Sequence, residues 1–218
     1  MTQTIEIQPT ISTIKRALEV VQGLTKTDKM PSSSYSIPAR ACNKGAKLRR
    51  IKGSVCSKCY ALKGNYARYP AIVESQQRRL ESITDSQWVE GMTFLINNKK
   101  DIKDSGVFRW HDSGDLQSLE HFEKILQVVR NTPQVKHWLP TKESQIVKNY
   151  KGIIPHNIVI RLSGSMIDSD TPPVYNNTSM VTTDKNKATC KSYENDGKCG
   201  ECRKCWDRDI KNITYLAH

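Results

Sequence analysis

The chain has 218 residues, of which 37% are hydrophobic, and its 34 Lys and Arg against 22 Asp and Glu give a net charge of +12. This length allows one good core, so a single domain is expected. No apolar run approaches the roughly 18 residues of a membrane helix, and a signal-peptide core is absent. The sequence therefore predicts a cytoplasmic protein without a membrane partner. Its charge suits nucleic acid or a nucleotide, with a basic surface that only aids solubility as the alternative.

Residues 1–41 are predicted to form an N-terminal arm. Its first apolar residues, Ile5 and Ile7, alternate as in an edge strand. Residues 11–24 have helical apolar spacing. Residues 25–40 are rich in Ser, Pro and Lys, and we expect an extended loop that leads into the first cysteine.

A run of cations without an acidic residue follows that first cysteine. We predict that it holds phosphates of a nucleic acid, with a solvated loop as the alternative. Tyrosines interleaved with cations come next, and they either stack on bases or pack against the fold. The residues predicted to bind nucleic acid are Lys44, Lys47, Arg49, Arg50, Lys52 and Tyr66.

The segment 42–165 is predicted to hold a three-cysteine loop and an α/β core. After two helices the pattern alternates between strands and helices, which is typical of βαβ units and a parallel sheet. The fold class is therefore α/β, with a small parallel sheet that resembles a partial, reduced TIM barrel. The predicted strands are residues 107–112, 135–141 and 157–163, and the helices 71–83, 88–98, 118–131 and 143–150.

Polar residues follow each predicted strand, and in parallel sheets the carboxyl ends of strands carry the chemistry. These residues are His111, Asp112, Ser113, Gly114 and Asp115 at the first end, Thr141, Lys142 and Glu143 at the second, and Arg161, Ser163 and Ser165 at the third. We expect a shared site, whose catalytic candidates are His111, Asp112, Asp115 and Lys142. An acid–base pair of His111 and Asp115 is one arrangement. Helix caps and satisfied loop residues are the alternative.

Residues 166–218 are predicted to form a connection and a cysteine-rich tail. The stretch 164–189 lacks apolar periodicity, and we expect a long surface connection there. The tail has four cysteines, three of them at two-residue gaps, which suits an iron–sulfur cluster or zinc. These four residues are Cys190, Cys199, Cys202 and Cys205.

The first cysteine group has only three members, Cys42, Cys56 and Cys59. In a reducing compartment such clusters favour metal over disulfides. A fourth ligand such as His111 or His218 would close a structural site. Alternatively, the three thiolates hold a [4Fe–4S] cluster and leave one iron open for a cofactor. A zinc ribbon that combines two cysteines of each group is a third arrangement.

The stretches CSKCYALKGNY, FRWHDSGDLQS, HWLPTKES, NIVIRLS and CGECRKCW carry a resemblance. Three cysteines followed by βαβ units with polar strand ends resemble radical S-adenosylmethionine proteins. More closely, the chain resembles small phage proteins of the gene product eighty-eight type, over residues 42–206. The radical proteins have a partial barrel with more β/α units than the three visible here.

The resemblance implies that the first cysteine group holds a [4Fe–4S] cluster whose free iron chelates the amine and carboxylate of S-adenosylmethionine. One electron would then cleave the sulfonium and release a 5′-deoxyadenosyl radical that takes hydrogen from the substrate. The four-cysteine tail would hold an auxiliary cluster, with zinc as the alternative. The cofactor-binding residues that the resemblance implies are Asp112, Ser113, Gly114 and Asp115 for the methionine amine, and Arg161 and Ser163 for the carboxylate or ribose.

The function expected is that of a phage-encoded iron–sulfur enzyme, similar to radical S-adenosylmethionine enzymes, that acts on nucleic acid or a nucleotide in the host cytoplasm. One alternative is a non-catalytic nucleic-acid-binding protein whose iron–sulfur or zinc sites are structural. Another is a phage protein that binds and inhibits a host factor. Hydrolase, P-loop and zincin functions lack a motif, since G-x-S-x-G, a phosphate-binding glycine loop and H-E-x-x-H are all absent.

Overall fold

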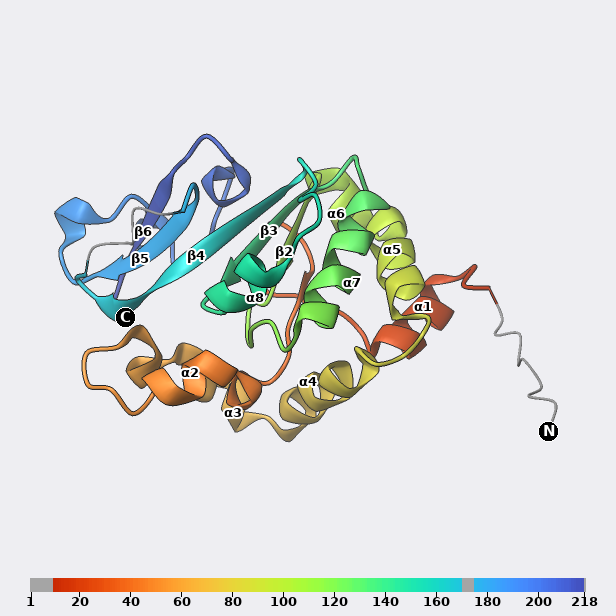
Figure 1. Ribbon diagram of the computed structural model, residues 1–218, viewed down its shortest axis with the longest axis horizontal. Coiled ribbons are helices and arrows are strands. Elements are labelled where there is room, and N and C mark those ends of the chain that lie inside the picture. Colours follow the sequence, from red (N-terminus) through yellow and green to blue (C-terminus); the bar gives the residue numbers. More distant parts are fainter. Residues whose placement is uncertain (1–9, 170–174, 218) are drawn as a thin grey trace.

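The computed structural model describes residues 10–169 and 175–217, and one six-stranded sheet organises them (Figure 1). Every neighbouring pair of strands is parallel, and the strands follow one another across the sheet in chain order. Right-handed crossovers in such an order place the connecting helices on one face. The strands are β1 (Ser34–Tyr35), β2 (Val107–Trp110), β3 (Lys136–Thr141), β4 (Ile158–Ile167), β5 (Thr178–Thr182) and β6 (Asn212–Leu216).

The helices begin where short polar side chains or proline favour a start. Thr13 and Ser118 each accept a hydrogen bond from the backbone N–H three residues later, and Pro70 occupies a first turn. Figure 1 shows α1, α5 and α7 packed together on one side of the sheet. The helices are α1 (Ile14–Val21), α2 (Asn43–Leu48), α3 (Asn65–Arg68), α4 (Pro70–Ser82), α5 (Trp88–Asn98), α6 (Lys100–Ser105), α7 (Leu119–Arg130) and α8 (Ser144–Asn149).

The strands bury both faces, and alternate residues divide between two cores. Phe108 and Trp110 of β2 join the large core under the helices. Val107 points to the opposite face, where it packs with Trp138 of β3 and Trp206 of the tail. Because side chains alternate along a strand, the position within each strand decides which core a residue meets. The cysteine-rich tail therefore covers the face that the helices leave free.

The predicted α/β class with a parallel sheet is confirmed, and the three predicted strands correspond to β2, β3 and β4. The predictions of an extended loop at 25–40 and a surface connection at 164–189 were wrong in part, because β1 lies in the first, and β5 and the end of β4 in the second. These strands are short or polar, so local patterns do not reveal them. The edge strand expected at Ile5 and Ile7 falls outside the described residues. No helix in the described ranges is long and apolar enough to span a membrane.

Candidate metal centres

The first three cysteines lie in the connection that follows β1. Cys42 precedes α2, and Cys56 belongs to a 3-10 turn over Val55–Lys58. An antiparallel bridge joins Ser54 to Met166, near the end of β4, and Ile167 donates a backbone hydrogen bond to the Gly53 carbonyl at 3.0 Å. In Figure 1 this segment, drawn in orange, lies beside the arrowhead of β4. The cysteine loop is therefore fixed at the carboxyl edge of the sheet.

Two of these sulfurs approach one point beside Gly45. A Cβ placed on Gly45 would lie 3.7 Å from the Sγ atoms of both Cys42 and Cys56, and 2.9 Å from the Cβ of Cys42. A residue larger than glycine would fill this space. The absence of a side chain at position 45 thus leaves a cradle between two thiols.

The three thiols of the first group are close enough to interact electrostatically. Burial, with smaller contributions from Asp115, Cys59 and Cys56, raises the pKa of Cys42 to about 12. Burial also raises the pKa of Cys56, which the cation of Lys142 opposes. Without a bound cation Cys42 and Cys56 keep their protons at neutral pH. A metal would displace the protons, because its charge stabilises thiolates.

The polar ends of β2 and β3 meet beneath the cysteine loop. The Oδ1 atom of Asp115 accepts hydrogen bonds from the Leu116 N–H at 2.8 Å and the Thr141 hydroxyl at 2.5 Å. Its Oδ2 atom accepts from the Lys142 N–H at 2.9 Å. Burial raises the pKa of Asp115 to about 6. The structure therefore brings Asp115 and Lys142 together, as the sequence predicted.

The end of β4 joins the same cluster through Lys142. Its ammonium donates to the carbonyl oxygen of Gly164, and burial lowers its pKa while Cys56 and Asp115 oppose that shift. Its neighbour Glu143 accepts from the Lys44 N–H at 2.6 Å, at the start of α2. Three strand ends and the cysteine loop thus share one site.

Asp112 carries two tyrosine contacts at the end of β2. Tyr66 donates its hydroxyl to Asp112 Oδ2 at 2.6 Å, and Tyr60 donates to the Asp112 carbonyl oxygen. Burial raises the pKa of Asp112. The Oδ1 atom of Asp112 and the Oγ atom of Ser113 are buried and lack a hydrogen bond of normal geometry among the described residues, although the Ser34 hydroxyl is close enough to lower the pKa of Asp112. Such unpaired buried groups are positions where a ligand can bind.

His111 does not join the predicted acid–base pair with Asp115. Its backbone φ is 54°, and its ring packs edge-on against His121, with centroids 5.4 Å apart. Burial lowers its pKa well below the usual value, and neither ring nitrogen has a partner among the described residues. The suggestion that His111 is a fourth ligand of the first group stays a prediction. The other suggested ligand, His218, falls outside the described residues.

Gly114 has a packing role that the sequence did not reveal. Its φ is +84°, and an added Cβ would lie 2.8 Å from the carbonyl oxygen of Ile37. The Ile37 N–H donates to the Ser113 carbonyl at 3.1 Å, which extends the contact beyond β1. Glycine is required here for close backbone approach.

Arg161 was predicted to bind the cofactor, but its guanidinium is fully used elsewhere. A guanidinium has five N–H donors, and here they bind the carbonyl oxygens of Thr178, Lys204, Cys205, Asp207 and Ile210. The side chain points to the tail face because its neighbours Ile158 and Ile160 point toward the helices. Arg161 therefore fastens the tail to the sheet. Ser163 contacts Ser179, with their hydroxyl oxygens 3.1 Å apart.

The four cysteines of the tail form a second electrostatic group. Burial raises the pKa of Cys199, as do Cys190 and Cys202, while Arg109 opposes the shift. Burial raises the pKa of Cys205 to about 11, and its sulfur lies 3.2 Å from the Tyr215 hydroxyl. Among cysteines, each shifted thiol has electrostatic neighbours from its own group only. This separation gives no support to a zinc ribbon shared between the groups.

Neither group is arranged as a finished site for a single ion. Within residues 10–169 and 175–217, no three His, Cys, Asp or Glu side chains are placed to hold one metal. Metal binding by the seven cysteines therefore stays a prediction.

The predicted nucleic-acid-binding cations divide into two kinds. Lys47, Arg50 and Lys52 are exposed. Arg49 is half-buried, and its charge opposes the raised pKa of Cys56, so it faces the cysteine loop. Tyr66 is half-buried, and its hydroxyl donates to Asp112 Oδ2, so less of its ring is open to a base than is the case for an exposed tyrosine.

Sequence reasoning missed Arg109 of β2, whose charge acts on Cys199 and Cys205 of the tail and on Asp112 at the end of β2. Its guanidinium lies 4.5 Å from the ring centre of Trp138. Burial opposes its charge, but Tyr60 and Asp112 on one side, and Tyr215 and Cys205 on the other, raise its pKa. Only the alternation along β2 could have indicated that this cation faces the tail.

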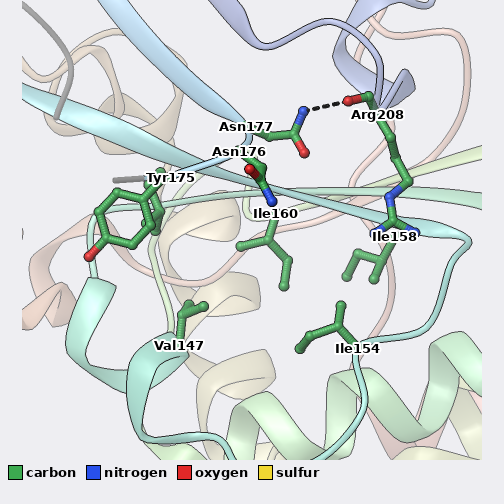
Figure 2. Close-up of a pocket in the computed structure, with 9 residues that line it drawn as sticks. Val147, Ile154, Ile158, Ile160, Tyr175, Asn176, Asn177 and Arg208 are labelled. Carbon is green, nitrogen blue, oxygen red and sulfur yellow. Dashed lines mark hydrogen bonds between the residues drawn. The ribbon is translucent and has the colours of Figure 1, made fainter. Parts of the chain in front are cut away.

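A cavity of about 170 Å³ lies away from these residues (Figure 2). Ile154, Ile158 and Ile160 line its base, and the Asn177 side chain donates to the Arg208 carbonyl at its rim. None of the predicted site residues borders it.

Comparison with known proteins identifies a family. The family described as Gene product 88 matches residues 11–208. No curated protein and no solved structure matches the chain.

Proposed function

The chain belongs to the Gene product 88 family, and we propose that it is an iron–sulfur enzyme, similar to radical S-adenosylmethionine enzymes, that acts on nucleic acid or a nucleotide. The family match agrees with the resemblance of the sequence to phage proteins of the gene product eighty-eight type. The proposal concerns the three-cysteine group at the carboxyl edge of the sheet.

The observation that carries the proposal is the cradle between Cys42 and Cys56. Both sulfurs lie 3.7 Å from the point that a Cβ on Gly45 would occupy, and Cys59 is within electrostatic reach of both. Three thiols without a fourth protein ligand suit a [4Fe–4S] cluster that keeps one iron open. The donor set therefore fits the group that we propose.

A bound cluster of this kind supplies an electron and an open iron for the amine and carboxylate of S-adenosylmethionine. The protein supplies the surroundings. The unpaired Oδ1 of Asp112 and hydroxyl of Ser113 are acceptors for an amine at the end of β2. Asp115, held by three donors, fixes the ends of β2 and β3 relative to one another. Lys142 brings a positive charge close to Cys56.

For the tail group we propose an auxiliary cluster, with structural zinc as the alternative. The Cys205 sulfur lies 3.2 Å from the Tyr215 hydroxyl of β6, and Arg161 binds carbonyl oxygens at Lys204, Cys205 and Asp207. This site has four protein thiols, the number that closes a tetrahedral metal site or a cluster site.

Product analysis tests the proposal. Protein purified without oxygen is counted for iron, sulfide and zinc, reduced, and mixed with S-adenosylmethionine. We expect 5′-deoxyadenosine and methionine in equal amounts. Cys42→Ser should abolish this product and keep the tail metal, whereas Cys202→Ser should remove the tail metal. A wild-type protein that contains zinc alone, or iron without cofactor cleavage, would contradict the proposal.

A further inference from the structure

The segment from Arg40 to Val73, which contains the first cysteine group, has positively charged side chains and no negatively charged ones. Its exposed cations are Arg40, Lys47, Arg50, Lys52, Lys58, Lys63 and Arg68. The four ion pairs found among the described residues all lie outside it. Because these positive side chains have no acidic partners within the segment, the surface attracts a polyanion.

The same segment presents apolar and aromatic side chains to solvent. Of the six large hydrophobic residues that are exposed in the described part of the chain, four belong to it. They are Ile51 at 48%, Tyr60 at 53%, Tyr69 at 49% and Val73 at 42% exposure. Exposed rings among cations are typical of proteins that bind single strands, because each base has a face that can stack.

Tyr60 is held in place by its own hydroxyl. That group donates to the carbonyl oxygen of Asp112, and the ring lies edge-on to Tyr66, with centroids 5.9 Å apart. Tyr66 is itself bonded to the Asp112 carboxylate at 2.6 Å. Half of Tyr60 nevertheless remains exposed. A ring that is already ordered loses little conformational entropy when a ligand stacks on it.

We propose that the Arg40–Val73 surface binds single-stranded nucleic acid, and that Tyr60 stacks on one base at the carboxyl end of β2. Tyr60 directly follows Cys59, so this base would lie beside the three-cysteine group. The base faces of a duplex are covered by their neighbours, and an enzyme that acts on a base needs it unstacked. The inference rests on the proposed function only for the reaction that follows binding.

Binding of labelled oligonucleotides tests the inference. Fluorescence anisotropy is measured on the full-length, anaerobically purified protein with single strands of about 15 nucleotides, dT or rU, and with a duplex of equal length. We expect tighter binding of a single strand than of the duplex, with affinity that falls steeply as salt rises. The dT and rU strands distinguish DNA from RNA.

Tyr60→Leu should weaken single-strand binding by roughly 5- to 100-fold, the usual effect of one lost stacking contact. Tyr60→Phe keeps the ring and should stay within about threefold of wild type. A melting curve of each variant checks the fold. Tyr60→Phe also keeps the test valid if Tyr60→Leu unfolds, because a large loss in a folded Tyr60→Phe protein would itself contradict stacking.

A matched pair of charge changes tests the surface. Arg50→Glu with Lys52→Glu should weaken binding by more than about tenfold. Lys100→Glu with Lys103→Glu, an equal charge change on α6, should have an effect below about threefold. Equal effects of the two pairs, or equal affinity for duplex and single strand with no effect of Tyr60→Leu, would overturn the inference.

The metal counts of the same samples separate the two proposals. Cofactor cleavage without single-strand binding contradicts only the inference. Single-strand binding by a protein that contains no iron supports the inference and contradicts the proposed iron–sulfur function.

Discussion

The two cysteine groups differ in their surroundings more than in their thiols. The first lies at the carboxyl edge of the sheet, beside Asp115 and Lys142. The second is pressed against the tail face, where Trp206 packs on Trp138 and Arg161 binds the tail carbonyls. Burial raises thiol pKa values in both groups. The comparison teaches that the first group lies beside the ionisable strand-end residues Asp115 and Lys142, whereas the second is joined to the sheet by aromatic packing and by Arg161.

Removal of the Arg161 guanidinium should have the largest effect on stability. Arg161→Met leaves five carbonyl oxygens without their donor, and we expect a loss of about 3–5 kcal/mol in the free energy of unfolding. Denaturant titration measures it. Arg208→Met is the matched control, because Arg208 is exposed and donates one bond to the His156 carbonyl; its loss should stay below about 1 kcal/mol. Similar losses in the two variants would mean that Arg161 does not hold the tail.

Acid should destabilise the helix-covered core, which lies apart from both cysteine groups. Burial lowers the pKa values of His121 and His137 to about 3. The unfolded chain therefore binds protons that the native state excludes, and this stability is complete above about pH 6.5 and is lost as pH falls. Asp115, with its pKa raised to about 6, acts in the opposite sense between about pH 6 and 4.

The two histidines together should cost about 3 kcal/mol between pH 6.5 and 5, since each contributes up to about 1.4 kcal/mol per pH unit, and Asp115 should return about 1 kcal/mol of this. Urea unfolding at several pH values measures the slope. His137→Gln should reduce the slope of the free energy of unfolding against pH by the equivalent of up to one bound proton. The exposed His156→Gln should leave this slope unchanged. Equal slopes in the two variants would contradict the contribution of His137 to the loss of stability in acid.

Filling the cradle of the first group should have an intermediate effect. In Gly45→Ala the new Cβ would lie 2.9 Å from that of Cys42, so the loop must shift, at a cost of about 1–3 kcal/mol. Iron at the first group should fall, while metal in the tail should not. Gly164→Ala is the control, because its nearest contact is an ordinary 3.5 Å. Equal metal loss in both variants would argue against the cradle.

The smallest expected effect concerns the carboxylate that joins the strand ends. Asp115→Asn places an amide N–H₂ where an oxygen accepts a hydrogen bond, and we expect a loss of about 1–2 kcal/mol. Asp168 also accepts three hydrogen bonds, from Thr182 and Thr183, but it is exposed. Thermal melting of Asp168→Asn should show a smaller shift. A larger shift there would mean that burial of Asp115 is unimportant.

Part of this fold was predictable from local patterns. Strands β2, β3 and β4 have clear apolar runs and flanking helices, whereas β1 is two residues long and β5 reads TSMVT. Such segments become strands only because a neighbour provides hydrogen bonds. The meeting of Asp115 with Lys142 followed from the rule that carboxyl ends of parallel strands share an edge.

The roles of His111 and Arg161 could not be predicted in this way. A positive φ turns His111 into the core, and the tail that occupies Arg161 lies more than 40 positions away in the sequence. Neither feature can be predicted from the spacing of residues that are close in the sequence. Gly45 lies between two cysteines in the sequence, but its importance depends on the 3.7 Å that would separate a Cβ at this position from the sulfurs of Cys42 and Cys56.

Paramagnetic resonance of the reduced protein tests the difference between the two groups most directly. The account predicts two iron–sulfur signals, of which one changes when S-adenosylmethionine is added. That responsive signal should be absent from Cys42→Ser and present in Cys202→Ser. Signals that ignore the cofactor in the wild-type protein, or a protein that holds only zinc, would contradict an open iron at the edge of the sheet.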